Sequence, residues 1–83
     1  MARICYFAWV REKIGTPEES LVLPEAVGTV SALLDFLCHK GEPYASVLAD
    51  PQLCVAVNRQ HAQRQDALTD HDEIAIFPPV SGG

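Results

Sequence analysis

The chain has 83 residues and a formal net charge of −5, from 6 Lys and Arg against 11 Asp and Glu. This length gives room for one small domain. The acidic balance argues against a nucleic-acid partner, because phosphate binding depends on clustered lysine and arginine. No apolar run reaches the ~20 residues of a membrane span, and the N-terminus has no signal-peptide pattern. We therefore expect a cytoplasmic protein without a membrane partner, and a carrier, binding module or subunit rather than a stand-alone enzyme.

The first half of the chain predicts two strands and a helical turn. Residues 3–10 are aromatic and branched on both alternating faces, which predicts a central strand, or a strand with one face in a partner-binding patch. Residues 11–15 are polar, end in glycine and predict a helical turn. Residues 19–23 predict a second strand that stops at Pro24 and pairs antiparallel with the first.

The clearest helix follows Thr29, a residue of the type that caps helix N-termini. Apolar residues then recur at the period of a helix. They are Val30, Leu33, Leu34, Leu37 and Cys38. We expect Gly41 to be the C′ residue that ends this helix, and residues 43–48 to form a short second helix.

The second half predicts strands at residues 53–57 and 73–77, with weak pairing at 61–65. The order strand, strand, helix, strand, strand predicts an α+β fold, in which one main helix packs across one mixed sheet. Residues 1–77 form the predicted domain and residues 78–83 a projecting tail.

The cysteines and histidines do not indicate a metal or redox site. Cys5, Cys38 and Cys54 are far apart, and no C-x-x-C pair occurs, so we interpret them as small apolar residues. The histidines show no spacing typical of metal ligands, and His61 and His71 are expected in solvated turns. We predict neither a bound metal nor a bound cofactor.

The last six residues have a different character. Pro78 and Pro79 cannot donate ladder hydrogen bonds and favour an extended path, so the chain is expected to leave the sheet there. Ser81, Gly82 and Gly83 have almost no side chain to pack against the domain. Such a thin segment fits a narrow channel, and the group it presents is the unhindered α-carboxylate of Gly83. A carboxylate needs activation before it accepts a nucleophile. Sulfur would then give a thiocarboxylate, and a lysine amine an isopeptide bond.

Residues 70–83, which end in Phe-Pro-Pro-Val-Ser-Gly-Gly, resemble the C-terminus of the small, sulfur-carrier subunit of molybdopterin synthase. Residues 6–15 and the interior Val55-Ala56-Val57-Asn58 are similar to this family too, so the resemblance spans the chain in order. It implies a ubiquitin-like β-grasp fold.

The resemblance also implies a cycle of charging and discharging. An E1-like adenylating enzyme uses ATP and magnesium to adenylate Gly83, and a sulfur donor protein converts the adenylate to a thiocarboxylate. The tail then enters the large catalytic subunit, in a heterotetramer, and sulfur passes to cyclic pyranopterin monophosphate for molybdenum cofactor biosynthesis. The chain itself is then non-catalytic. Residues Pro78, Pro79, Val80, Ser81 and Gly82 would form the inserted arm, with Phe77 a contact residue at its base.

Two positions depart from the family pattern, and several alternatives stay open. His71 stands where glycine is common, and His61 where an apolar contact residue is common. The alternatives are a thiamine-thiazole sulfur carrier, a ubiquitin-like modifier conjugated to lysines, and a binding module whose two glycines are incidental. Ubiquitin-type tails usually carry arginine near the glycines, and none lies between Asp66 and Gly83.

Overall fold

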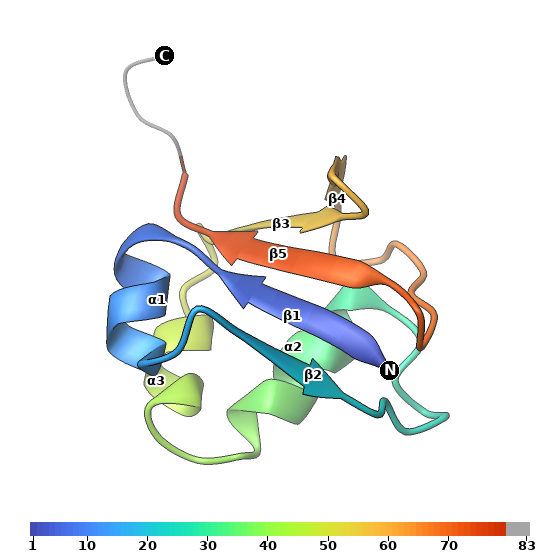
Figure 1. Ribbon diagram of the computed structural model, residues 1–83, viewed down its shortest axis with the longest axis horizontal. Helices are drawn as coiled ribbons and strands as arrows, with labels where there is room; N and C mark the ends of the chain where they lie inside the picture. Colours follow the sequence, from blue (N-terminus) through green and yellow to red (C-terminus); the bar gives the residue numbers. More distant parts are fainter. Residues whose placement is uncertain (80–83) are drawn as a thin grey trace.

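In the computed structural model, which describes residues 1–79, five strands form one mixed sheet. The strands are β1 (Ala2–Tyr6), β2 (Glu18–Leu21), β3 (Cys54–Val57), β4 (Gln60–Ala62) and β5 (Glu73–Phe77), and the helices are α1 (Ala8–Ile14), α2 (Val30–Cys38) and α3 (Tyr44–Leu48). Across the sheet the order is β2-β1-β5-β3-β4. The central strand β5 is parallel to β1 and antiparallel to β3 (Figure 1). The predicted α+β fold with a mixed sheet is confirmed.

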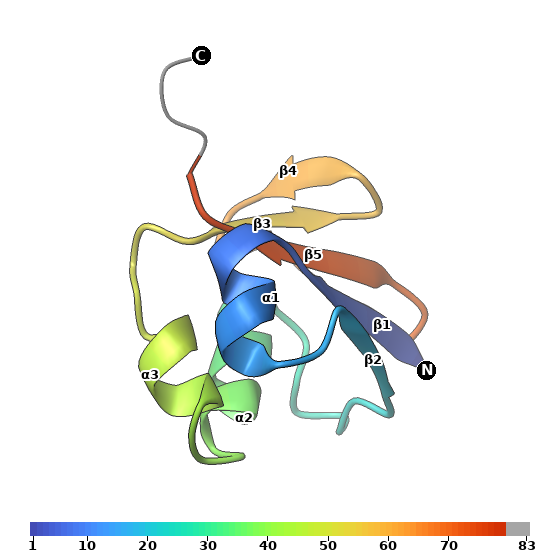
Figure 2. The same cartoon turned by 60° about the vertical axis from the view of Figure 1, so that its left-hand side comes forward.

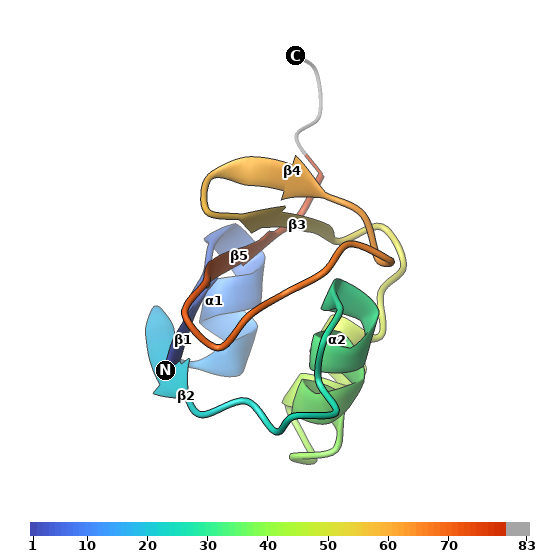
Figure 3. The ribbon, with the colours of Figure 1, turned by 90° about the vertical axis from the view of Figure 1, so that its right-hand side faces the viewer.

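The helices pack against one face of the sheet, and no helix of the described residues covers the other face (Figure 3). The core between these layers joins the inward residues of β1, β3 and β5 to the apolar side of α2. Its most deeply buried members include Ile4, Tyr6, Val10, Leu33, Leu37, Val55, Ile74 and Ile76. Within residues 1–79 no helix has the length and apolarity needed to cross a bilayer.

The start of α2 is as the sequence predicts, and its end differs slightly. The Thr29 hydroxyl accepts a hydrogen bond from the Ala32 amide at 3.1 Å, which caps the helix. The helix ends at Cys38 with His39 as C-cap, so Gly41 lies one residue beyond the C′ position expected for it. Gly41 has a φ of 93°, which glycine adopts without strain. The short helix expected over residues 43–48 is confirmed as α3.

The prediction of one strand over residues 3–10 is wrong in its second half. The strand β1 ends at Tyr6, and α1 covers Ala8–Ile14. Ala8 has a φ of 54°, which breaks the strand and reverses the chain direction. Val10 and Ile14 are then one helical turn apart and both face the core. The expected helical turn at residues 11–15 belongs to this helix, which ends at Gly15 in the left-handed conformation.

The predicted hairpin of the first two strands is confirmed, with Ile4 paired to Glu19, although β2 covers Glu18–Leu21 rather than residues 19–23. Glu19 also connects β2 to the helices. Its carboxylate accepts hydrogen bonds from Tyr6 at 2.9 Å, Tyr44 at 2.7 Å and Lys40 at 2.8 Å. Lys40 lies over the Tyr44 ring, 4.5 Å from its centroid. This cluster joins the edge strand to the α2–α3 segment.

A two-residue turn connects β3 and β4. Asn58 and Arg59 have φ values of 51° and 70°, the pattern of a type I′ hairpin turn. The Asn58 side chain donates to Asp72 at 3.0 Å and accepts from the Glu73 amide at 3.0 Å, so the turn is tied to the start of β5. The pairing expected at residues 61–65 occurs at Gln60–Ala62. His61 therefore lies in a strand, and its predicted place in a turn is wrong.

Candidate functional site

The described chain ends beside the C-terminal ends of β1 and β5. The Phe7 amide donates to the Ile76 carbonyl at 3.1 Å, which holds the end of β1 against the end of β5. Helix α1 begins at this same end of the sheet (Figure 2). Phe77 is the last residue of β5. Pro78, half-buried, and Pro79, exposed, follow outside any strand. This end of the sheet, where β1 and β5 finish, is therefore the base of the predicted tail.

Aromatic and apolar side chains lie at this end of the sheet, on the face that the helices do not cover. Ile76 faces the core, so the alternation of the strand turns Phe77 to the opposite face. Phe77 is paired in register with Cys54 of β3. The rings of Phe77 and His61 meet edge to face, with 5.7 Å between centroids and 73° between planes. Phe7, 49% exposed, follows β1 at the same edge. We call Phe7, Cys54, His61 and Phe77 the open-face cluster.

Small side chains lie next to this cluster. Cys5 of β1, Ala75 of β5 and Ala56 of β3 are in register with one another across the sheet, and Ala56 is paired in turn with His61. A row of small residues on a sheet leaves a flat apolar floor. An exposed aromatic side chain such as Phe7 next to a flat apolar surface is typical of a protein–protein contact.

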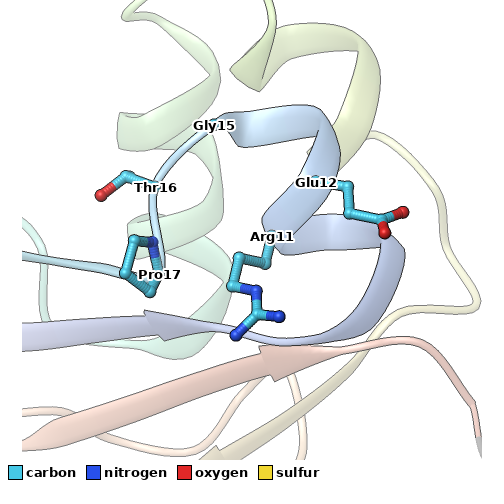
Figure 4. A pocket seen from close by; sticks show the side chains of 5 residues that line it. All are labelled: Arg11, Glu12, Gly15, Thr16 and Pro17. Carbon is cyan, nitrogen blue, oxygen red and sulfur yellow. The ribbon is translucent and has the colours of Figure 1, made fainter.

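The pocket at the end of α1 contains no catalytic constellation. A shallow pocket of about 430 Å³ lies between the end of α1 and the start of β2, lined by Arg11, Glu12, Gly15, Thr16 and Pro17 (Figure 4). Arg11 and Glu12 point in different directions there, and the Thr16 hydroxyl donates to the Glu18 carbonyl at 3.1 Å. None of these side chains forms a pair of nucleophile and base.

Residues 1–79 also bring no three potential metal ligands together. Their three cysteines are free thiols, with Cys5 buried and Cys38 and Cys54 half-buried. Burial and the nearby Asp35 carboxylate raise the pKa of the Cys38 thiol, so it is a poor nucleophile at neutral pH. The open-face cluster contains the third of these thiols, Cys54, which is paired in register with Phe77.

The structure describes three of the seven predicted site residues, namely Phe77, Pro78 and Pro79, and brings them to one edge of the sheet. Val80, Ser81, Gly82 and Gly83 lie outside the described residues. Sequence reasoning did not include Phe7 or His61 among the site residues. Phe7 had a signal, since it lies on the second apolar face of the first strand. His61 had one as well, since it stands where the resembled family commonly has an apolar contact residue, although its contact with Phe77 across β3 is not readable from the sequence.

Comparison with known proteins decides the family. The pattern of the ThiS family matches residues 4–83. The chain belongs to the ThiS family. It is 36% identical to the molybdopterin synthase sulfur carrier subunit of Haemophilus influenzae and 37% identical to that of Escherichia coli, each over 83 residues and all of both chains. The predicted membership in this family of carrier subunits is confirmed.

Solved structures agree with this assignment. A putative molybdopterin converting factor, subunit 1, from Pyrococcus furiosus has a TM-score of 0.77 at 28% identity, over 95% of this chain and 97% of that one. SAMP1 from Haloferax volcanii has a TM-score of 0.75 at 27% identity, over 99% and 98%. The predicted β-grasp fold is confirmed by these neighbours.

Proposed function

We propose that this ThiS-family chain is the sulfur-carrier subunit of a molybdopterin synthase, and that Gly83 carries the sulfur. The observation that carries the proposal is the sequence identity of 36% and 37% between this chain and two proteins named molybdopterin synthase sulfur carrier subunit, over the whole length of each. The fold supports it, because Phe77 is the last residue of β5 and lies at the base of the segment that leads to Gly83.

The chemistry proposed for Gly83 has three steps. Its carboxylate attacks the α-phosphate of ATP on an E1-like enzyme, with magnesium, and pyrophosphate leaves. A donor protein delivers sulfur at the oxidation level of sulfide, which attacks the acyl carbon and displaces AMP to give a thiocarboxylate. In the large catalytic subunit the sulfur passes to cyclic pyranopterin monophosphate, and the carrier recovers its carboxylate after hydrolysis. This chain contributes the C-terminal carbonyl of Gly83, the preceding Gly82 without a side chain, and the docking surface. The partner contributes the catalytic side chains.

Intact-mass analysis tests the proposal. The chain, produced together with its activating enzyme and sulfur donor, should gain the mass of one sulfur-for-oxygen exchange. A variant without Gly82 and Gly83 should gain none, yet unfold at the same temperature, because these residues have no side chains to bury. An unchanged mass of the full chain, with an activating enzyme shown to work on a known carrier, would refute the proposal.

The docking surface is tested separately. Phe77→Ala should weaken binding of the catalytic subunit by about 30-fold, the effect of losing a central aromatic contact. Val22→Ala is the matched control. Val22 is an apolar residue 67% exposed, but it follows the edge strand β2, so affinity should not change. Equal affinities of wild type and Phe77→Ala would remove Phe77 from the interface.

A ubiquitin-like modifier is the second candidate. It is favoured by structural similarity to the small archaeal modifier protein 1 of Methanosarcina acetivorans, with a TM-score of 0.70 at 25% identity over 99% of this chain and 95% of that one. The same mass analysis separates the two functions. A modifier gives lysine-linked adducts with other proteins, whereas a carrier gives a thiocarboxylate.

A further inference from the structure

His61 is held over the base of the tail by contacts that span three strands. It lies on β4 opposite Ala56 of β3, and Phe77 lies beyond β3 on β5. The methyl group of Ala56 leaves room for the imidazole to reach across, and its ring meets that of Phe77 edge to face at 5.7 Å. Such aromatic pairs contribute roughly 0.5–1.5 kcal/mol beyond area burial. The imidazole therefore has a preferred position beside Phe77 rather than a freely rotating one.

The two ring nitrogens of His61 have no hydrogen-bond partner in the part of the chain that the structure describes. Among residues 1–79, no side chain or backbone group exchanges a hydrogen bond with either ring nitrogen of His61, and the residue is exposed. In the free chain, water forms hydrogen bonds with these ring nitrogens. A protein that covers Phe77 also covers a ring only 5.7 Å away, and it removes that water. A buried N–H group without an acceptor is unfavourable.

We propose that His61 determines which catalytic subunit this carrier accepts, by donating a hydrogen bond from its imidazole to an acceptor oxygen on that subunit. The inference rests on the proposed function, because it takes the catalytic subunit as the protein that covers Phe77. A subunit with an acceptor opposite His61 satisfies the N–H group. A subunit with a purely apolar surface there leaves it unpaired and binds more weakly. His61 is thus a specificity residue of the docking surface.

The test measures the affinity of the catalytic subunit from the same organism by calorimetric titration. His61→Leu removes both ring nitrogens and leaves the partner's oxygen unpaired, so affinity should fall by about 5- to 100-fold. His61→Gln and His61→Asn each keep an N–H donor, at about the distance of one or the other imidazole nitrogen from the backbone. One of these two variants should therefore recover most of the lost affinity. Melting curves check that each variant is folded. His71→Leu is the matched control, because His71 is exposed before the opposite end of β5, and its affinity should equal that of wild type.

The outcomes separate this inference from the proposed function. If Phe77→Ala weakens binding but His61→Leu binds as tightly as wild type, the hydrogen bond does not exist and the proposed function stands. If His61→Gln and His61→Asn are both as weak as His61→Leu, the ring shape and not the donor matters, and the inference is wrong. If Phe77→Ala also binds normally, the interface lies elsewhere and both the docking surface and the role of His61 are refuted.

Discussion

Glu19→Ala tests the polar cluster that joins β2 to the helices. Tyr6 is only 1% exposed, and its hydroxyl donates to Glu19. Removing the carboxylate leaves this buried hydroxyl without its acceptor, which costs about 1–3 kcal/mol. Loss of the partly buried Lys40 pair adds up to about 1 kcal/mol. The free energy of unfolding should fall by about 1–4 kcal/mol, and the melting temperature by roughly 4–30 °C for a domain of this length.

The same variant has a distinct pH dependence. Burial favours the neutral Glu19 carboxyl, but hydrogen bonds from the Lys40 ammonium and the two tyrosine hydroxyls outweigh it and hold the pKa below its ordinary value. A lowered folded-state pKa stabilises the protein above the unfolded pKa, near 4.3, and this contribution is lost as pH falls through the folded value. The stability difference between wild type and Glu19→Ala should therefore be largest near neutral pH and shrink in acid.

Urea denaturation at pH 7 and in acid, on wild type and variants, gives these differences directly. Glu18→Ala is the matched control, because Glu18 precedes Glu19 on the same strand but is half exposed, in a pair with Arg3 at 2.8 Å. It should cost at most about 1 kcal/mol. Asp70 and Asp72 also have lowered pKa values, chiefly from hydrogen bonds donated by backbone amides, and their effects cancel in the comparison. A Glu19→Ala effect no larger than that of Glu18→Ala, or one that does not change with pH, would refute the reasoning.

Three further substitutions test the scaffold by the same denaturation assay. Arg59→Gly should stabilise the chain by roughly 0.5–1 kcal/mol, because the second residue of the type I′ turn has a φ of 70° that suits glycine; a loss of stability would contradict this turn assignment. Thr29→Ala should cost about 1 kcal/mol through loss of the α2 cap, and Thr29→Ser should restore most of it. Leu33→Ala should cost about 2–5 kcal/mol, because Leu33 is fully buried; Ala26→Gly, at an exposed position, is its control.

The elements that the sequence predicts well are those in which local and long-range signals agree. β5 occupies residues 73–77 as expected, because Ile74 and Ile76 alternate with residues that face the other side of the sheet, a pattern that fits a strand and also fits the core. The helix that begins after Thr29 combines a cap with an apolar stripe of helical period. In such segments the tertiary structure has no reason to override the local preference.

The errors have physical causes of their own. The apolar residues of the first strand continue without interruption past Tyr6, so composition gives no sign that the chain turns at Ala8. The left-handed φ of Ala8 is unusual for a residue with a side chain, and burial of Val10 and Ile14 by α1 offsets its strain. The spacing of those two residues was the available signal. His61 could not be placed, because its neighbours depend on the register of β4 with β3 and of β3 with β5.

The position of the docking surface follows from the place of β5 in the sheet. β5 is hydrogen-bonded on both sides, to β1 and to β3. Ile76 is paired with both Tyr6 and Val55, and Phe77, the next residue, is paired with Cys54 of β3. Openings that cross central strands approach the free energy of global unfolding. The body of β5 up to Ile76 is therefore held as firmly as the fold itself, while Phe77 and His61 face away from the helices. On the proposed docking role, substitutions at these two residues should alter partner binding with little effect on the core, which is the separation that the binding and stability measurements above are designed to detect.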